Sequence, residues 1–343
     1  MTGDPIDAVI TWVDGNEPAY QEKLAHYLSQ TRWVHPEATA KTRFCQIGEL
    51  EYCVTSLFRF APWLRNIYIV TDNQIPALLG KLGGTCYENK VYLIDHKVIF
   101  SGFENFLPTF NSKTIGSLLW QIPGLSEKFI YFNDDCFLIK PVSPTDFFQN
   151  DCVVLRGRWR KCRSLKLSRR IRTRIKNFFL KTPPEAVFPK HKLAQEYSAR
   201  LVGYDKAFFY LYHTPHGFIR SKLANYFALH SEQLKNNLRF RFRAVDQFVI
   251  SSLAAHLQIK ANEAVIDKKL DALQLKIEVE PLYEVIQKLN QADMNKKLAF
   301  ICVQSLDNTP PLARNIIFDW LDKRIGSFES FLAHKQKNLE TFC

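Results

Sequence analysis

Two adjacent carboxylates, Asp134 and Asp135, directly follow an apolar run that is typical of a buried strand. Asp14 closes a second run of the same kind, at residues 11–15. Ligands of open α/β sheets bind at the carboxyl ends of strands, so we expect chemistry at these acids. Two buried carboxylates repel each other unless a cation lies between them, which indicates a divalent metal that carries a pyrophosphate. The alternative is an acidic turn without function, because Asn and Asp are common turn residues.

The elements that must position these acids alternate between strands and helices. In the first half, the patterns predict strands at 6–13, 67–71, 91–94 and 129–132, and helices at 18–30, 47–58 and 112–121. This alternation predicts an α/β fold with a mostly parallel sheet flanked by helices. Beyond residue 156, helices are expected at 185–200, 219–229, 245–256, 281–289, 313–321 and 328–335, and the apolar run 298–303 is expected to return to the sheet. We therefore predict a core at 1–155, a basic segment at 156–182 and a mainly helical lobe at 183–343 that returns to the core.

The chain has 343 residues and a formal net charge of +12, and one segment carries the whole excess. Between Arg156 and Lys181 there are twelve Lys or Arg residues and no acid. Leu167, Ile171 and Ile175 recur there at helical spacing, which predicts an amphipathic helix with a basic face. Such a helix can lie on an anionic membrane, bind nucleic acid or another polyanion, or simply be solvated.

The eight cysteines include no Cys-x-x-Cys pair and show no regular spacing. This pattern favours reduced thiols over a disulfide framework or a zinc site. The first residues show no signal-peptide pattern, and no stretch approaches the roughly 18 apolar residues that a spanning helix needs. With 46% apolar residues, the composition is that of a globular rather than a disordered protein, and we expect a cytoplasmic one.

Several ordered motifs resemble the Stealth family, which includes bacterial capsule hexose-1-phosphate transferases and the lysosomal-enzyme N-acetylglucosamine-1-phosphotransferase. Asp-Ala-Val-Ile-Thr-Trp-Val-Asp-Gly at 7–15 resembles the first conserved block. The second block is matched at 43–44, 48–52, 60–65, 69–76, 107–112 and 124–135. The segment 213–216 (His-Thr-Pro-His), followed by Arg241, Arg243 and Asp246, resembles the third block, and 316–331 resembles the fourth. The family commonly carries a Glu and a His where this chain has Gly116 and Trp120, which implies a different sugar or acceptor geometry.

The resemblance implies a phosphotransferase of capsule or exopolysaccharide synthesis, with a Rossmann-like or GT-A-like sheet. Such an enzyme moves hexose-1-phosphate from a UDP-hexose or UDP-N-acetylhexosamine to a hydroxyl of a glycan or lipid-linked glycan, and UMP leaves. One alternative is a metal-dependent glycosyltransferase that releases UDP; another is a non-catalytic module that binds an anionic glycan or a membrane. The expected location is the cytoplasm, with peripheral contact to the inner face of the membrane through 156–181 and no nucleic acid partner.

The same resemblance implies roles for individual residues. Asp134 and Asp135 would hold Mg²⁺ or Mn²⁺, and His213 or His216 would take the proton of the acceptor hydroxyl. The expected catalytic residues are His213, His216, Asp135 and Arg243. The expected substrate contacts are Trp12, Asp14, Arg43, Glu49, Asp72, Gln74, Asn111 and Arg241. Two of these have structural alternatives, since Arg43 can pair with Glu49 and Trp12 can belong to the core.

Overall fold

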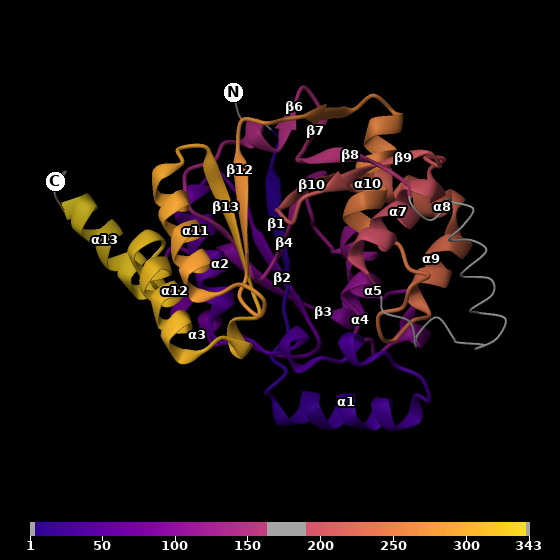
Figure 1. Ribbon diagram of the computed structural model, residues 1–343, viewed down its shortest axis with the longest axis horizontal. Coiled ribbons are helices and arrows are strands. Elements are labelled where there is room, and N and C mark those ends of the chain that lie inside the picture. Colours follow the sequence, from indigo (N-terminus) through magenta and orange to yellow (C-terminus); the bar gives the residue numbers. More distant parts are fainter. Residues whose placement is uncertain (1–3, 163–189, 341–343) are drawn as a thin grey trace.

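The structure, a computed structural model, describes residues 4–162 and 190–340 (Figure 1). The strands are β1 Ile6–Thr11, β2 Ile67–Thr71, β3 Val91–Asp95, β4 Lys128–Asn133, β5 Cys136–Leu138, β6 Phe148–Gln149, β7 Cys152–Leu155, β8 Gly157–Lys161, β9 Ala207–Leu211, β10 His216–Ile219, β11 Ala264–Ile266, β12 Asp271–Lys276 and β13 Leu298–Gln304. The α-helices are α1 Pro18–Gln30, α2 Glu49–Phe60, α3 Leu78–Leu82, α4 His96–Ile99, α5 Ser112–Gly116, α7 His191–Leu201, α8 Arg220–Leu229, α9 Ser231–Leu238, α10 Ile250–Lys260, α11 Leu282–Met294, α12 Pro311–Arg324 and α13 Phe328–Glu340.

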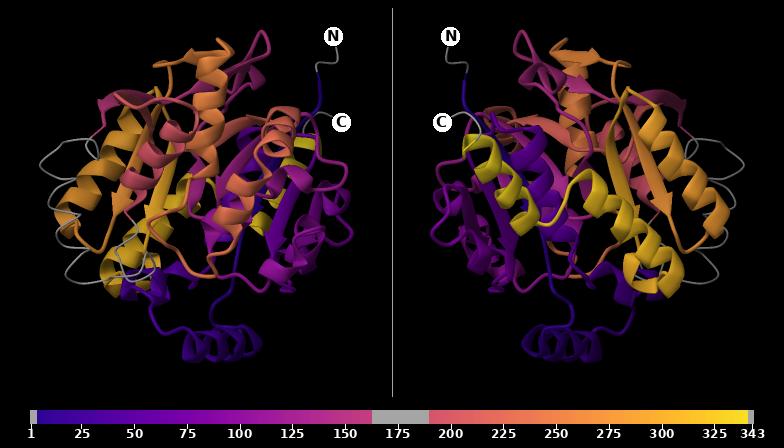
Figure 2. Two further views of the ribbon diagram at one scale, coloured as in Figure 1. Left: turned by 90° about the vertical axis from the view of Figure 1, so that its right-hand side faces the viewer. Right: turned by 90° about the vertical axis from the view of Figure 1, so that its left-hand side faces the viewer.

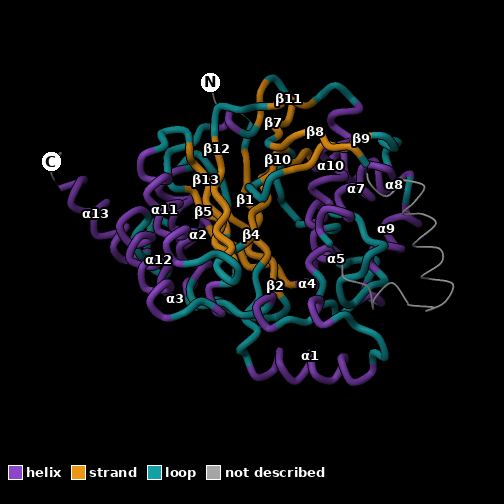
Figure 3. The backbone as a smooth tube through the Cα atoms, in the orientation of Figure 1, coloured by secondary structure: helices purple, strands orange, loops and turns teal. Residues whose placement is uncertain are grey.

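The central sheet has five strands in the order β10-β4-β1-β2-β3. Strands β4, β1, β2 and β3 run parallel, and β10 pairs antiparallel with β4 at the edge. Figure 3 shows these strands in the middle of the molecule, between two groups of helices. The predicted α/β fold with a mostly parallel sheet is therefore confirmed. Because Thr11 of β1 pairs with Asn133 of β4, the segments that carry Asp14 and Asp134 leave the sheet at the same edge.

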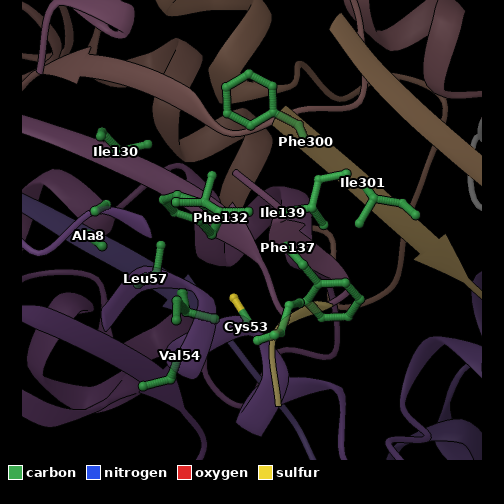
Figure 4. Packing of buried hydrophobic residues seen from close by; sticks show 14 of the residues in the cluster. Ala8, Cys53, Val54, Leu57, Ile130, Phe132, Phe137, Ile139, Phe300 and Ile301 are labelled. Carbon is green, nitrogen blue, oxygen red and sulfur yellow. The ribbon is translucent and has the colours of Figure 1, made fainter. Parts of the chain in front are cut away.

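Successive side chains of each strand point to opposite faces of the central sheet, and each face carries its own hydrophobic core. Ile10, Ile69 and Phe132 belong to the core on the side of α2, whereas Val9 and Phe129 belong to the core on the opposite face. Figure 4 shows the first core, where side chains of α2, β4, β5 and β13 interdigitate. Both faces are covered, so the parallel strands are apolar at nearly every position.

A second sheet, in the order β12-β13-β5, packs beside α2. The run 298–303 is a strand, as predicted, but it pairs with β12 and β5 and does not join the central sheet. Only two residues, Asp134 and Asp135, separate the end of β4 from the start of β5, so the carboxylate pair occupies the turn between the two sheets. In Figures 1 and 2, α11, α12 and α13 lie on the side of this second sheet, while α1 projects from the body.

The second half of the chain contains more strand than the sequence indicates. β9, β10, β11 and β12 were not predicted, because segments of three to six residues are too short for their pattern to distinguish a strand from a helix. The helix predicted at 112–121 is also interrupted: α5 ends at Gly116 and a 3₁₀ turn follows at Leu119–Gln121. Where the chain divides into domains remains a prediction.

The basic segment 156–182 begins as a strand rather than a helix. β8 covers Gly157–Lys161 and pairs with β9, while the predicted amphipathic helix at 167–179 lies outside the described residues. Arg156 is 3% exposed, and its Nη2 donates to the carbonyl of Asp146 at 2.6 Å. Its guanidinium also lies 4.8 Å from the ring centroid of Phe300, so this cation is part of the fold and not of a solvated basic face. Among the described helices, none has the length and apolar character needed to span a membrane.

Candidate active site

A cavity of about 1150 Å³ opens at the carboxyl ends of β1 and β4. The chain contributes to its wall from widely separated segments, between Thr11 and Asn308. The predicted residues that line it are Trp12, Arg43, Glu49, Asp72, Asp134, Asp135, His213, His216 and Arg243. The structure thus brings together the expected metal ligands and all expected catalytic residues, which lie far apart in the sequence.

Three buried or partly buried carboxylates form one side of the cavity. Burial raises the pKa of Asp134 well above its usual value, and the charges of Asp135 and Glu49 raise it further. The pKa of Glu49 is raised chiefly by burial, although its carboxylate accepts a hydrogen bond from the backbone N–H of Ile47 at 2.6 Å. No described cation forms an ion pair with Asp134 or Glu49. This surplus of negative charge suits a divalent cation, so the residues fit the metal expected from the sequence.

His213 links this acidic side to the second half of the chain. Its Nε2 lies 3.8 Å from Oδ1 of Asp135, and the side-chain amide of Asn133 points to the same nitrogen at 3.2 Å. Burial alone would lower the pKa of His213, but Cys136 and Asp135 raise it well above its usual value. The same contact lowers the pKa of Asp135 against the opposing effect of burial. His216, at the start of β10, is different, because burial lowers its pKa to about 3 and keeps the ring neutral.

Arg43, Lys113 and Arg243 form a cationic side of the same cavity. Lys113 was not predicted; it follows Ser112 at the start of α5 and is 8% exposed. Its Nζ donates to the carbonyl of Ala244 at 3.0 Å, and Nη2 of Arg243 donates to Oγ of Ser112 at 2.7 Å. Burial, together with the charges of the two arginines, lowers the pKa of Lys113 to about 7, and burial lowers the pKa of Arg243 to about 9. Within the described residues, neither Lys113 nor Arg243 has a carboxylate partner, so this side is built to receive an anion.

Trp12, at the end of β1, is largely core, but its polar atom faces no described partner. The side chain is 7% exposed and lines the cavity, and Nε1 has no hydrogen-bond acceptor among the described residues. A buried indole N–H usually finds a partner, so a bound ligand can supply one.

Two other residues that line the cavity, Arg43 and Asp72, also form ion pairs within the fold. Arg43 forms its ion pair with Glu37, at 3.9 Å, and not with Glu49. Asp72 is held by Nζ of Lys23 at 2.8 Å. Both side chains still line the cavity, so these contacts do not remove them from it.

The residues Asp14, Gln74, Asn111 and Arg241 do not line the cavity. Gln74 is 3% exposed and holds the backbone of Asp14, since its Oε1 accepts from Asp14 N at 3.0 Å and its Nε2 donates to Asp14 O at 2.8 Å. Asn111 is fully buried, where its side chain caps α5 and donates to Gln247 Oε1 at 2.8 Å. Arg241 donates to the carbonyl of Pro108 at 2.7 Å. Their role as substrate contacts stays a prediction; in the structure they hold the loops that carry the site.

A second group of potential metal ligands lies beside the carboxylate pair. One ligand atom from each of Asp135, Cys136, His213 and Cys302 lies within 4.8 Å of every other. The two cysteines were not predicted as ligands, because they are 166 positions apart in the sequence and oppose each other only once β5 and β13 pair. The described cysteines are all free thiols.

Comparison with known protein families gives two matches in the first part of the chain. Residues 4–32 match the model of Stealth protein CR1, conserved region 1, and residues 43–155 match that of Stealth protein CR2, conserved region 2. The resemblance found in the sequence is confirmed for these residues. The similarity of 213–248 and 316–331 to later blocks remains a prediction.

Among curated proteins, the chain is similar to bacterial polysaccharide phosphotransferases. It is 46% identical over 145 residues to an exopolysaccharide phosphotransferase of Streptomyces coelicolor, which covers 42% of this chain and 25% of that protein. It is 43% identical over 145 residues to a capsular polysaccharide phosphotransferase of Haemophilus influenzae, covering 42% and 38%. A capsular polysaccharide phosphotransferase of Actinobacillus pleuropneumoniae is 37% identical over 198 residues, covering 57% and 48%. The alignments thus span from a quarter to about half of these relatives.

Similar solved structures are glycosyltransferases. The galactosyltransferase LgtC in complex with donor and acceptor sugar analogues has a TM-score of 0.45 at 11% identity, covering 95% of this chain and 99% of that one. The glycosyltransferase GlyE of Streptococcus pneumoniae has a TM-score of 0.46 at 10% identity, covering 98% and 64%.

Proposed function

The chain carries conserved regions 1 and 2 of the Stealth proteins, and from this premise we propose that it is a sugar-1-phosphate transferase of bacterial capsule or exopolysaccharide synthesis. The donor is a UDP-hexose or UDP-N-acetylhexosamine, the acceptor is a hydroxyl of a glycan or lipid-linked glycan, and UMP is the leaving product. The relatives are named polysaccharide phosphotransferases, but the alignments cover only 25% and 38% of two of them. The proposal therefore also rests on the site itself.

One observation carries the proposal: a single cavity has a carboxylate side and a cationic side. Asp134 and Asp135 lie on the first, and Arg43, Lys113 and Arg243 lie on the second. A nucleotide-sugar pyrophosphate needs both, because its oxygens are neutralised by a metal and by cationic side chains. A cavity of about 1150 Å³ also has room for a nucleotide-sugar together with part of an acceptor.

In this proposal, Asp134 and Asp135 hold Mg²⁺ or Mn²⁺. When bound, the metal would neutralise charge on the phosphate oxygens of the donor. Arg43, Lys113 and Arg243 bind the oxygens on the opposite side. Trp12 offers its unpaired indole N–H, or the face of its ring, to the nucleoside or the sugar.

The proposed reaction is an in-line displacement at the phosphorus that bears the sugar. His213 or His216 takes the proton of the acceptor hydroxyl, and the hydroxyl oxygen forms a bond to that phosphorus. The bond from the same phosphorus to the bridging oxygen breaks, and UMP leaves with that oxygen. The product is a phosphodiester that links sugar and acceptor, and the cationic side stabilises the charge that develops on the leaving oxygen.

The test is to identify the nucleotide that is released. The protein is incubated with a panel of UDP-sugars, Mg²⁺ or Mn²⁺ and a crude bacterial glycan, and the products are separated by chromatography. We expect UMP that forms only in the presence of acceptor. Acceptor-dependent UDP would instead identify a glycosyltransferase, which breaks the carbon–oxygen bond, and no nucleotide with any donor would favour the non-catalytic module.

The matched variants are Asp134→Asn with Asp135→Asn, and Asp151→Asn as a control. Asp151 is a surface acid outside the cavity, and its side chain is 87% exposed. The double variant should lose at least about 100-fold in turnover, in line with the loss of charge stabilisation at a phosphoryl transfer site, while the control keeps full turnover. An active double variant would refute the role of the carboxylates.

Peripheral contact with an anionic membrane through residues 163–181 is part of the same proposal. It is supported by the charge of that segment alone. Sedimentation with vesicles that contain phosphatidylserine should capture the protein at low salt and release it at high salt. No capture at low salt would remove this part of the proposal.

A further inference from the structure

Four ligand atoms of mixed type converge beside the cavity, whose wall includes Asp135 and His213. They come from three segments: Asp135 and Cys136 at the turn into β5, His213 just before β10, and Cys302 in β13. We infer that they form a site for Zn²⁺ or a similarly soft divalent cation, which shares Asp135 with the Asp134 and Asp135 oxygen pair and takes its other three ligands from elsewhere.

The sheet geometry explains how two distant cysteines meet. Cys136 and Cys302 oppose each other in the antiparallel pair of β5 and β13. Opposed residues in such a pair project from the same face, with Cβ atoms about 4.5–5.5 Å apart. Cys136 and Cys302 are 2% and 1% exposed and do not line the cavity, so both are shielded from solvent.

The remaining two ligands reach this thiol pair from the cavity side. Sγ of Cys136 lies 3.5 Å from Oδ1 of Asp135, and that oxygen lies 3.8 Å from Nε2 of His213. Tetrahedral zinc, with bonds of about 2.0–2.3 Å, places neighbouring ligand atoms roughly 3.3–3.8 Å apart. These two separations fall in that range, and all four ligand atoms lie within 4.8 Å of one another, so the ligands would need only to draw together around the zinc ion.

Backbone contacts also hold the ligands in place. The backbone N–H of Val303, next to Cys302, donates to the carbonyl of Asp135 at 3.0 Å and fixes the turn against β13. Fixed neighbours of this kind are what a metal site needs to keep its ligands oriented.

The ligand types favour zinc over magnesium. Two sulfurs and one imidazole nitrogen are soft or borderline ligands, whereas Mg²⁺ prefers oxygen ligands in an octahedral arrangement. Four protein ligands fill the tetrahedral shell, which is typical of a zinc ion that supports structure rather than one that binds substrate. Its effect would be to tie β13 and the segment before β10 to the turn that carries the carboxylates.

The inference of a zinc site does not depend on the proposed reaction, but a bound zinc ion would affect which histidine acts as the base. A His213 nitrogen that is bound to zinc cannot take a proton from the acceptor. Of the two histidines considered above, His216 would then be left as the candidate base.

The test is metal binding by the full chain. Protein purified without a metal-affinity step is stripped with a chelator, and Zn²⁺ is titrated in the presence of a competing indicator and millimolar Mg²⁺. We expect about one Zn²⁺ per chain that Mg²⁺ does not displace. Co²⁺ in its place should give the near-ultraviolet absorption of cobalt–thiolate bonds, a readout that does not depend on catalysis.

Variants separate the site from other thiols. Cys136→Ser and Cys302→Ser should each weaken zinc binding at least about tenfold and reduce the cobalt–thiolate absorption. Cys53→Ser is the matched control, since Cys53 is fully buried nearby, with Sγ 3.9 Å from the carbonyl of Asn133, but is not one of the four ligands. It should bind Zn²⁺ as the unchanged chain does.

Three results would overturn the zinc site: no zinc bound by the unchanged chain, zinc kept in full by Cys136→Ser with Cys302→Ser, or a Cys136–Cys302 disulfide in protein isolated from cells. The outcome is separate from that of the nucleotide test. A chain that binds no zinc yet releases UMP refutes the zinc site alone, and a chain that binds zinc yet releases no UMP refutes the transfer alone.

Discussion

Lys113 should couple the binding of a pyrophosphate to the uptake of a proton. Burial beside Arg243 and Arg43 lowers its pKa from 10.5 to about 7, so the side chain is mostly neutral at pH 8 before a ligand binds. A pyrophosphate in the cavity compensates this burial and raises the pKa again. Binding at pH 8 therefore protonates Lys113, and the proton comes from the buffer.

The size of the effect follows from the same values. One pKa unit corresponds to about 1.36 kcal/mol, so the cost of the buried ammonium at low pH is on the order of 5 kcal/mol. At pH 8, a group with a pKa near 7 is roughly 90% neutral, so binding of UDP should take up about 0.9 proton. Above pH 7 the affinity for UDP should fall by up to about tenfold per pH unit, because binding takes up a proton and the proton concentration falls tenfold with each unit.

The assay is isothermal titration calorimetry with UDP and Mg²⁺ in two buffers that differ in ionisation enthalpy. The difference in measured heat gives the number of protons taken up. Lys113→Met should abolish the uptake and weaken binding at pH 7, whereas Lys113→Arg should keep a cation and lose only the pH dependence. Equal heats in both buffers, with the same affinity at pH 7 and pH 9 for the unchanged chain, would refute this account of Lys113.

Stability should change with pH in a direction set by the same lysine. Its folded-state pKa is lowered, so between about pH 7 and the unfolded value of 10.5 the unfolded chain binds more protons than the folded chain. The free energy of unfolding should therefore rise with pH across this window, relative to Lys113→Met. Urea unfolding of both proteins at pH 7 and pH 9 measures the difference, and a parallel response of the two would contradict it.

Other predictions concern the residues that support the site. Asn111→Ala should lower the free energy of unfolding by about 1–3 kcal/mol, because it removes the buried hydrogen bonds to Gln247 Oε1 and to the carbonyl of Phe240, yet leave UDP affinity unchanged; a tenfold loss of affinity would restore Asn111 as a substrate contact. Arg65→Met should lower the free energy of unfolding by about 1–3 kcal/mol in urea, since Asp7 is fully buried and would keep only backbone N–H partners, while the half-exposed Arg65 is partly screened by solvent; an unchanged value would contradict this. Gly15→Ala should lower the melting temperature, because its new Cβ would lie 2.5 Å from Cβ of Phe44; an unchanged value would show that the loop adapts.

Local signals predicted the first half of the fold well. The helix Pro18–Gln30 and the strand Ile67–Thr71 have the bounds expected from the sequence, since a proline begins the first and β-branched residues form the second. The strand β10 was missed because its pairing with β4 depends on residues more than 80 positions away. Short strands of this kind are decided by tertiary contacts, which no local pattern contains.

The candidate site shows the same division. Asp134 and Asp135 were predicted from their place at the end of a strand, a rule of topology that the structure obeys. Gln74 and Asn111 lie in the same motifs but hold backbone groups, because motif membership does not tell a ligand contact from a loop support. Lys113 and the Cys136–Cys302 pair were missed, since burial and cross-strand register arise only when the chain has folded.

The edge position of β10 bears on how the protein is made. Strand β4 is complete at Asn133, but β10, which covers its outer edge, starts at His216. While the ribosome adds the intervening residues, the nascent chain presents the open edge of β4, and unpaired strand edges are templates for association with other chains. A fragment that ends at residue 155 would hold both matched conserved regions and keep that edge exposed. Expression of the conserved regions alone is therefore expected to yield aggregates. In the full chain, a chaperone that binds exposed strand edges would protect β4 until residue 219 has left the ribosomal exit tunnel and β10 can pair.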